Sequence, residues 1–522
     1  MRNFYLAVIL VFLASTSSQA SDSRLLNWIR ENRSFKTQMP FSFQIPNDRQ
    51  DLYKEMGQVD HVEGIIERHI VREGIVIYDA ALWQIVLTRL GQKTDLKLAE
   101  TPTKIYWDGH LGDLSNVRAG YPDQPYIYDM ADPMRVSSHL SQKGQRGFIF
   151  RILNANGRYQ ASDPLDEKTH LDGFPNGDQL HWEDWKPIAG ENAWVVIGAL
   201  HLYHQKYFNL NRGEYVAPRN TIELKLAEEL ARAAMILQAE NGGIRMAPLG
   251  TFYNPYVDEN GQLTITHEER LTLLPDLSGS KIVELVLGKQ PPPEKYSWHY
   301  YEISTENTLS WHAAFRMLYR ITRKIEYQQA MERIEGYLRD VWNEKENVLD
   351  QGMHFTDGKW QPNQKYFATD VQYLALMVIG PSRLERWFGG GAPLKIWQAT
   401  KKKSGVFERG ILLGLGYTQE HDRISLEWTA ASLLALDMLR DHYRTSQPQL
   451  VKEIHKDRDS MRQAMEKYRY QVDEDESAYS YSSRRGWIPF GWFSHDPEVL
   501  SLASTCWVLL VDEGVNPLVL EK

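Results

Sequence analysis

Cysteine is almost absent from this sequence, because Cys506 is the only one among 522 residues. One thiol cannot form an intramolecular disulfide, so a chain of this size must be held together by its hydrophobic core. Cys506 lies in an apolar run, residues 502–510, and we expect it to be a small buried core residue rather than a nucleophile.

Long apolar runs and excess positive charge are lacking as well. After residue 20 no segment reaches the roughly 18 uncharged apolar residues that a transmembrane helix needs, so we expect no membrane span. The chain has 59 Lys and Arg against 68 Asp and Glu, a formal net charge of −9. This acidic balance argues against nucleic acid or an anionic membrane surface as the main partner.

Several catalytic and cofactor motifs are also missing. The sequence has no His-Glu-x-x-His, no paired cysteines, no Gly-x-Ser-x-Gly elbow and no glycine-rich phosphate loop in a strand–loop–helix context. The run Gly389-Gly390-Gly391 is followed by Ala-Pro, which does not suit a nucleotide site. We therefore expect no metal ion and no cofactor.

The first 20 residues have the pattern of a secretory signal peptide. Arg2 precedes an apolar run over residues 4–14, and the segment closes with Ser18-Gln19-Ala20, which places small residues where signal peptidase requires them. The pattern predicts a cleaved signal over residues 1–20 and a periplasmic or secreted mature protein.

What the sequence has in quantity is a recurring helical pattern. Apolar segments that are hydrophobic on nearly every side alternate with amphipathic ones, such as residues 222–237 and 327–341. The apolar segments are residues 78–90, 191–203, 306–321, 370–379, 427–439 and 500–511. Buried helices alternating with surface helices predict a mainly α fold, an (α/α)6 toroid of six helical hairpins. We expect one domain over residues 21–522, with long loop or short β insertions around 101–187 and 241–302.

Five of the six apolar segments begin with an acidic residue: Asp79, Glu191, Glu306, Asp370 and Glu427. A carboxylate in the first turn of a helix can simply cap it. In a toroid, however, all five would enter one cavity, where repulsion and desolvation are costly unless the groups have a function. Paired carboxylates hydrolyse glycosidic bonds as acid and base or nucleophile. Glu306 is the first candidate for the acid and Glu191 the second; the other three are candidates for the base, water positioning or hydroxyl binding.

Aromatic residues are abundant, with 16 Trp, 27 Tyr and 17 Phe. Most Trp and Tyr in a large protein belong to its core, but flat aromatic faces edged by polar groups also suit a sugar ring. The candidates for substrate binding are the aromatic residues Trp182, Trp185, Trp298, Tyr300, Tyr301, Trp428, Trp487 and Trp492, together with Asn192, Asn307 and Arg484.

The sequence also resembles the six-hairpin glycosidase superfamily over roughly residues 78–516. The similarity lies in the apolar helices with acidic heads and in four phrases: Gly190-Glu191-Asn192-Ala193-Trp194, Ser304-Thr305-Glu306-Asn307, Thr369-Asp370-Val371-Gln372 and Ser425-Leu426-Glu427-Trp428-Thr429-Ala430. The resemblance implies an (α/α)6 barrel, a carbohydrate cleft at the mouth formed by the N-terminal ends of the inner helices, and acid/base chemistry on glycosides. The same fold also serves polysaccharide lyases and sugar epimerases, and fold alone does not choose among them.

The preferred hypothesis is a monomeric glycoside hydrolase that acts on a polysaccharide or oligosaccharide. A polysaccharide lyase on a uronate-containing glycan is an alternative, because Tyr481, Arg484 and Arg485 form a basic, aromatic stretch that could supply a base and a cation. A second alternative is a non-catalytic carbohydrate-binding protein of an exopolysaccharide system, which would keep the aromatic residues but would not need the carboxylates.

Overall fold

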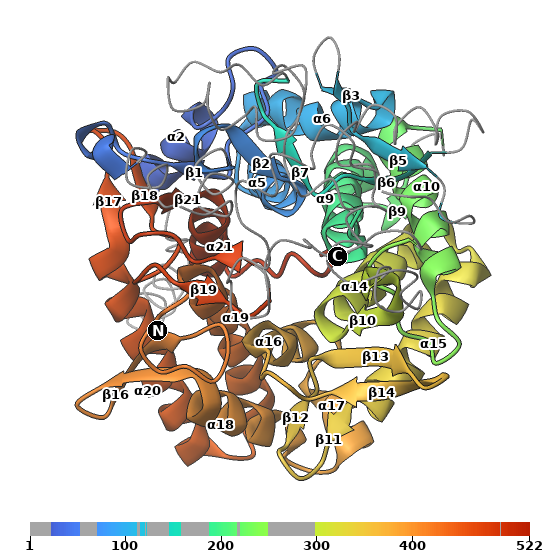
Figure 1. Cartoon of the computed structure of the whole chain (residues 1–522), viewed down its shortest axis with the longest axis vertical. Coiled ribbons are helices and arrows are strands. Elements are labelled where there is room, and N and C mark those ends of the chain that lie inside the picture. Colours follow the sequence, from blue (N-terminus) through green and yellow to red (C-terminus); the bar gives the residue numbers. More distant parts are fainter. Residues whose placement is uncertain are drawn as a thin grey trace, which may run out of the picture.

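The computed structural model describes residues 22–52, 70–111, 115–120, 122, 146–157, 187–216, 220–248, 298–490 and 492–521. In this part of the chain, helices dominate and form two concentric rings, which Figure 1 shows from one end. The predicted mainly α toroid is therefore confirmed. The predicted signal segment, residues 1–20, lies outside the described residues, as do large parts of the two expected insertions.

The inner ring consists of six helices in the described part of the chain. They are α5 (Ile77–Arg89), α9 (Ala189–Tyr207), α14 (Thr305–Thr322), α16 (Thr369–Val378), α19 (Leu426–Tyr443) and α21 (Leu502–Asp512). Each packs against the next, and α21 packs against α5, so the ring is closed. These helices are buried on nearly every side, as the sequence predicted. Cys506 on α21 is fully buried, as expected.

The outer ring covers the inner one. Its helices are α2 (Ser23–Glu31), α6 (Lys93–Asp108), α10 (Ile222–Leu237), α15 (Ile325–Asp340), α17 (Pro381–Phe388), α18 (Ala392–Ser404) and α20 (Pro448–Met465). Helices α6, α10, α15, α18 and α20 pack against the inner helix that precedes them in the chain. There are two exceptions: α17 packs against α18 and the following inner helix, α19, and α2, which comes first in the sequence, packs against α21, the last inner helix. The sixth hairpin of the toroid is thus assembled from the two ends of the chain.

Short antiparallel strands connect the helices. The pairs are β1 (Phe43–Gln44) with β21 (Leu500–Ser501), β2 (Gly74–Val76) with β7 (Ile152–Asn154), β3 (His110–Leu111) with β4 (Ser115–Asn116), β5 (Arg118–Gly120) with β6 (Arg146–Ile149), β8 (Phe208–Asn209) with β9 (Glu214–Tyr215), β11 (Trp342–Asn343) with β12 (Val348–Leu349), β15 (Gly405–Glu408) with β16 (Ile411–Leu415), β17 (Arg469–Gln471) with β18 (Ser477–Tyr479), and β19 (Trp487–Ile488) with β20 (Trp492–Phe493). A three-stranded sheet joins β10 (Glu302–Ser304), β13 (Gly352–Thr356) and β14 (Lys359–Asn363).

Three of these strands fix the heads of inner helices. Strands β2, β10 and β21 run directly into α5, α14 and α21, so their pairing holds the first turns of these helices in place. Core tryptophans add further ties: the indole of Trp83 on α5 donates to the carbonyl of Ile29 on α2 at 2.8 Å. The indole of Trp311 on α14 donates to the carbonyl of Ala189, the first residue of α9, also at 2.8 Å. The N-terminal mouth of the inner ring is therefore a rigid frame.

The C-terminal segment after α21 crosses the other end of the ring, where the inner helices finish (Figure 1). Its carbonyls accept hydrogen bonds from His201 on α9 and from Arg316 and Arg320 on α14. In the described residues, no helix is both long enough and apolar enough to cross a membrane.

Candidate active site

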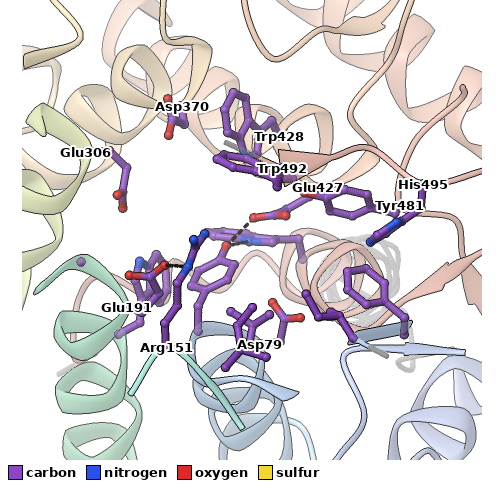
Figure 2. A pocket seen from close by; sticks show the side chains of 18 of the residues that line it. Asp79, Arg151, Glu191, Glu306, Asp370, Glu427, Trp428, Tyr481, Trp492 and His495 are labelled. Atoms are coloured by element: carbon purple, nitrogen blue, oxygen red, sulfur yellow. Dashed lines mark hydrogen bonds and ion pairs between the residues drawn. The ribbon is translucent and has the colours of Figure 1, made fainter. Parts of the chain in front are cut away.

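All five acidic residues predicted at the inner-helix heads line one cavity of about 210 Å³. Figure 2 shows Asp79, Glu191, Glu306, Asp370 and Glu427 around it, each from a different inner helix. They occupy the second or third residue of α5, α9, α14, α16 and α19, so the same position in each hairpin delivers a carboxyl group to the same place.

Capping does not account for the two glutamates on α14 and α19. The hydroxyl of Ser304 caps α14 by accepting from the backbone N–H of Asn307 at 3.3 Å. The hydroxyl of Ser425 caps α19 in the same way, by accepting from the N–H of Trp428 at 3.2 Å. Because serine already satisfies these backbone groups, Glu306 and Glu427 are not needed as caps.

Four of the carboxyl groups have a pKa far above the usual range. Burial raises the pKa of Glu306 and Glu427 to about 8, and that of Asp79 and Asp370 to about 7. Repulsion adds to burial: the charges of Asp370 and Glu191 raise the pKa of Glu306, and those of Asp79, Asp370 and Glu306 raise that of Glu427. Because these carboxyl groups are buried in one cavity, some of them keep their protons near neutral pH.

Each glutamate of the cavity has a different neighbour. The hydroxyl of Ser310, one turn further along α14, donates to Oε1 of Glu306 at 2.9 Å. Nε of Arg151 forms an ion pair with Oε1 of Glu191 at 2.7 Å. The hydroxyl of Tyr78 donates to Oε1 of Glu427 at 2.6 Å. The carboxyl groups therefore differ chemically although their positions in the helices are equivalent.

Aromatic rings make up much of the remaining lining. Of the predicted binding residues, Trp428 and Trp492 line the cavity. The lining also includes residues that the sequence did not mark as candidates, Tyr78, Arg151, Trp194, Tyr373, His495 and Trp507, and it includes Tyr481, which the sequence offered only for the lyase alternative. Three of them carried a usable signal, since Trp194 and Tyr373 stand three residues after an acidic head and Tyr78 stands directly before one. Arg151 and His495 come from connecting segments and had no such signal.

The other described candidates lie elsewhere. Asn192 is fully buried behind the cavity, where its amide exchanges hydrogen bonds with the backbone of Ile149. Asn307 is 5% exposed and packs between the heads of α9 and α14. Tyr300 lies under the guanidinium of Arg245, at 4.3 Å from its ring centre. None of these three residues is part of the cavity lining.

The remaining binding candidates are also away from the cavity or outside the described residues. Tyr301 stacks against Phe355 of β13. Arg484 forms an ion pair with Asp422 at 2.6 Å, and the ring of Trp487 packs on Phe493. Trp182 and Trp185 lie outside the described residues, and only the backbone of Trp298 is described, in a short 3₁₀ turn, Trp298–Tyr301.

A metal site made of side chains needs several His, Cys, Asp or Glu groups placed around one ion. Over the described ranges, no three of these residues are so placed. The carboxyl groups of the cavity thus line it without converging on a single point.

Comparison with known proteins identifies the architecture. No family model matches the sequence, and no curated protein matches it. Among solved structures, a D-mannose isomerase matches with a TM-score of 0.52 at 9% identity, covering 95% of this chain and 96% of the other. The shared fold is an (α/α)6 barrel of six helical hairpins.

Two further structures have the same barrel. A sugar epimerase from a ruminal bacterium matches with a TM-score of 0.50 at 11% identity, over 95% of this chain and 98% of its own. A cellobiose 2-epimerase from Bacillus thermoamylovorans B4167 matches with a TM-score of 0.50 at 11% identity, over 95% and 97%. At such low identity these (α/α)6 proteins share the fold with this chain, and the chemistry must be argued from the cavity.

Proposed function

We propose that the protein is a carbohydrate-active enzyme that hydrolyses glycosidic bonds in an oligosaccharide or polysaccharide. One observation carries the proposal: Glu306 and Glu427, which are not needed as helix caps, lie in one aromatic-lined cavity, and both have a pKa of about 8. Hydrolysis needs one carboxyl group that carries a proton near neutral pH and a second group that accepts one.

Glu306 is the proposed general acid. Burial and the neighbouring charges of Asp370 and Glu191 keep its proton bound near neutral pH. Ser310 and Trp194 both hydrogen-bond to this carboxyl group, and the Ser310 hydroxyl can turn to donate or to accept, so this partner tolerates both the charged and the neutral form. This neighbour suits a residue that gives up a proton and takes it back in every cycle.

The charge of the cavity favours a substrate without carboxylate groups. A lyase acting on a uronate needs a cation to neutralise the sugar carboxylate. Among the described lining residues the permanent cation is Arg151, and Glu191 already pairs with it. Arg484, the cation considered for a lyase, pairs with Asp422 and is 60% exposed. A uronate would add another negative charge beside carboxyl groups whose mutual repulsion already raises their pKa.

Sugar epimerisation or isomerisation is the second candidate, because the (α/α)6 structures with the TM-scores quoted above are epimerases and an isomerase of sugars. Such a reaction moves a proton at the carbon beside a carbonyl group, and carboxyl groups with a pKa near 7 could take part. It differs from hydrolysis in a way that products reveal, since no water is added and no bond between sugars is broken.

The experiment is an incubation of the mature protein with a panel of neutral, amino and uronate glycans in water enriched in oxygen-18. Mass spectrometry of the products separates the hypotheses. Heavy oxygen in a new reducing end supports hydrolysis. An isomer of unchanged mass supports epimerisation, and an unsaturated product supports a lyase. E306Q and E191Q serve as controls: a pure binding protein would keep its glycan affinity in both variants and would have no turnover to lose.

The proposal includes export and a monomeric state. Residues 1–20 have the charge and hydrophobic pattern of a signal peptide, so we propose a periplasmic or secreted enzyme. The intact mass of the protein recovered from an exporting host should correspond to a chain that begins at Ser21. Light scattering of that material should give the mass of one chain.

A further inference from the structure

Glu427 belongs to a chain of hydrogen bonds that crosses three inner helices. Nε1 of Trp507 on α21 donates to the hydroxyl oxygen of Tyr78 on α5 at 2.7 Å. That hydroxyl in turn donates to Oε1 of Glu427 on α19 at 2.6 Å, the dashed line at Glu427 in Figure 2. The three residues all line the cavity, and they are far apart in the sequence.

The direction of this chain is fixed by the chemistry of its first member. An indole N–H has no lone pair and can only donate, so the oxygen of Tyr78 must accept from Trp507. The one hydrogen of the Tyr78 hydroxyl is then left for Glu427. Burial and the charge of Glu427 hold the pKa of Tyr78 well above its usual value, so this hydrogen stays on the tyrosine.

The ring of Tyr78 is also held in place. Trp194 on α9 meets it edge to face with ring centres 5.0 Å apart, and meets Trp507 in the same way at 5.8 Å. Trp507 is fully buried, so it has little freedom to turn away. Four inner helices thus position one hydroxyl group against one carboxylate oxygen.

The hydrogen bond from Tyr78 determines which oxygen of Glu427 can bind a proton. Its Oε1 always accepts from Tyr78, so a proton bound by this carboxyl group resides on Oε2, the oxygen that receives no hydrogen bond from the described residues. Glu306 accepts from the Ser310 hydroxyl, which can reverse its role, and a hydrogen bond from Trp194 also lowers its pKa. Burial and neighbouring charges raise the pKa of both glutamates to about 8, and for Glu427 the hydrogen bond from Tyr78 opposes this rise by stabilising the charged form.

From this geometry we propose that Glu427 is the base of the site, and that Tyr78 positions it, with Trp507 fixing the direction of the Tyr78 hydroxyl. The inference rests on the proposed hydrolysis and names its second carboxylate. Oε2 of Glu427 takes a proton from water while the water oxygen bonds to the anomeric carbon. The bond from that carbon to the leaving oxygen breaks, and Glu306 gives its proton to that oxygen. Proton exchange with solvent then restores both carboxyl groups.

The first test is the pH dependence of kcat/KM in Y78F, which removes one oxygen atom and keeps the ring. Without the hydrogen bond from Tyr78 the pKa of Glu427 rises, so the acidic limb moves up by about one pH unit. At the optimum, kcat/KM falls roughly tenfold to a hundredfold. E427Q lowers kcat by about 10² to 10⁴. An unchanged acidic limb in an otherwise folded Y78F would overturn the positioning role.

The second test asks whether Trp507 acts through Tyr78. W507F removes the indole N–H, so the acidic limb should move in the same direction as in Y78F. In the double variant, W507F should add no further shift, because the hydroxyl that it orients is gone. If Trp507 served in packing alone, W507F would leave the acidic limb where it is, or would shift it by the same amount in the wild type and in Y78F. Either result would contradict the proposal.

A matched control lies in the same cavity. Nε1 of Trp492 donates to the hydroxyl of Tyr481 at 2.8 Å, so the same indole–phenol pair occurs there without a hydrogen bond to Glu427. Y481F should lower turnover if Tyr481 contacts substrate, but it should leave the acidic limb where it is. A shift as large as that of Y78F would mean that the loss of any buried hydroxyl has this effect, and would overturn the assignment to Tyr78.

A readout that does not depend on turnover separates this inference from the proposed function. A carboxyl pKa that is higher in the folded than in the unfolded chain makes stability fall as the pH rises through the folded pKa. The Tm of Y78F should therefore drop further below that of the wild type as the pH rises from about 7 to about 9, and this widening should vanish in the E427Q background. Widening without hydrolysis of any glycan would confirm the hydrogen-bond chain and overturn the role of base, and hydrolysis without widening would overturn the chain alone.

Discussion

Among the single residues, Glu306 shows how the fold prepares a proton donor. Its side chain is held at the head of a buried helix, and burial raises its pKa to about 8. The charges of Asp370 and Glu191 contribute to this rise, and hydrogen bonds from Ser310 and Trp194 oppose it. The balance leaves the carboxyl group protonated at neutral pH, yet close enough to ionisation to release its proton to a leaving group.

The pH dependence of activity should reflect this balance. We expect kcat/KM to fall tenfold for each pH unit above about 8, because Glu306 then loses the proton that it must donate. E306Q should lower kcat by about 10² to 10⁴ and abolish this alkaline limb. Initial rates measured from about pH 5 to pH 10 would show it. E332Q, an exposed change on the outer helix α15, should keep the limb. An alkaline limb that persists in E306Q would assign it to another carboxyl group.

The acidic residues of the cavity could be predicted from the sequence because each lies in the first turn of an apolar helix, and this pattern recurs along the chain. The residues that form hydrogen bonds with them could not be predicted. Tyr78 and Glu427 are hydrogen-bonded across a separation of 349 residues, and no local pattern links them. Asn192 shows the opposite failure: it stands next to an acidic head in the sequence, but the helical rotation turns its side chain to the backbone of Ile149, behind the cavity.

Among the helices and strands, α9 and α14 pack tightly against each other near the site. A Cβ atom added at Gly190 would lie 2.0 Å from Oδ1 of Asn307. Glycine at this position therefore lets the heads of the two helices touch. Glu191 comes directly after Gly190, and Glu306 comes directly before Asn307. The contact between Gly190 and Asn307 therefore sets how far apart the two carboxyl groups lie.

G190A should separate the two heads. We expect a loss of about 1–3 kcal/mol in the free energy of unfolding and a lower kcat. Denaturant melts and initial rates would measure both. N307A should restore much of the loss in the double variant, because it removes the atom that the new methyl group meets. G336A on the outer helix α15 is the control: nothing lies within 4 Å of a Cβ there, so it should stabilise by about 0.5–1 kcal/mol. If G190A and G336A changed the free energy of unfolding equally, the contact between α9 and α14 would not explain the effect of G190A.

Helices with a strong period were predictable, and short strands were not. The apolar segments became the inner ring, and residues 222–237 and 327–341 correspond to α10 and α15. Strands such as β19 and β20 have two residues each, too few for an alternating pattern to be visible. The helix α2 was missed for another reason. Its partner, α21, lies at the opposite end of the chain. The sequence pattern pairs each apolar segment with the amphipathic segment that comes next, so it does not link α2 to α21.

Considered as a whole, the molecule is closed at one end by its own C-terminal segment. Arg316 and Arg320 on α14 donate to the carbonyls of Leu518 and Leu520, and Nε2 of His201 on α9 donates to the carbonyl of Pro517 at 2.7 Å. The amide of Asn516 donates to the carbonyl of Met377 on α16. The side chains of Leu518 and Leu520 are buried in the core. Three neighbouring inner helices are therefore tied together at the end opposite the proposed site.

Removal of this segment should weaken the barrel rather than the chemistry. A chain that ends at Gly514 loses the buried side chains of Leu518 and Leu520, and it leaves the partly buried guanidinium of Arg316 without one of its acceptors. Together these losses exceed about 5 kcal/mol, a large share of the stability of an ordinary protein. Calorimetry should show a Tm several degrees lower, and L518A alone should cost about 2–5 kcal/mol. R444A, which removes an exposed ion pair with Asp441, should stay within about 0.5 kcal/mol of the wild type. A truncated chain that melts with the wild type would show that the ring of inner helices closes without this segment.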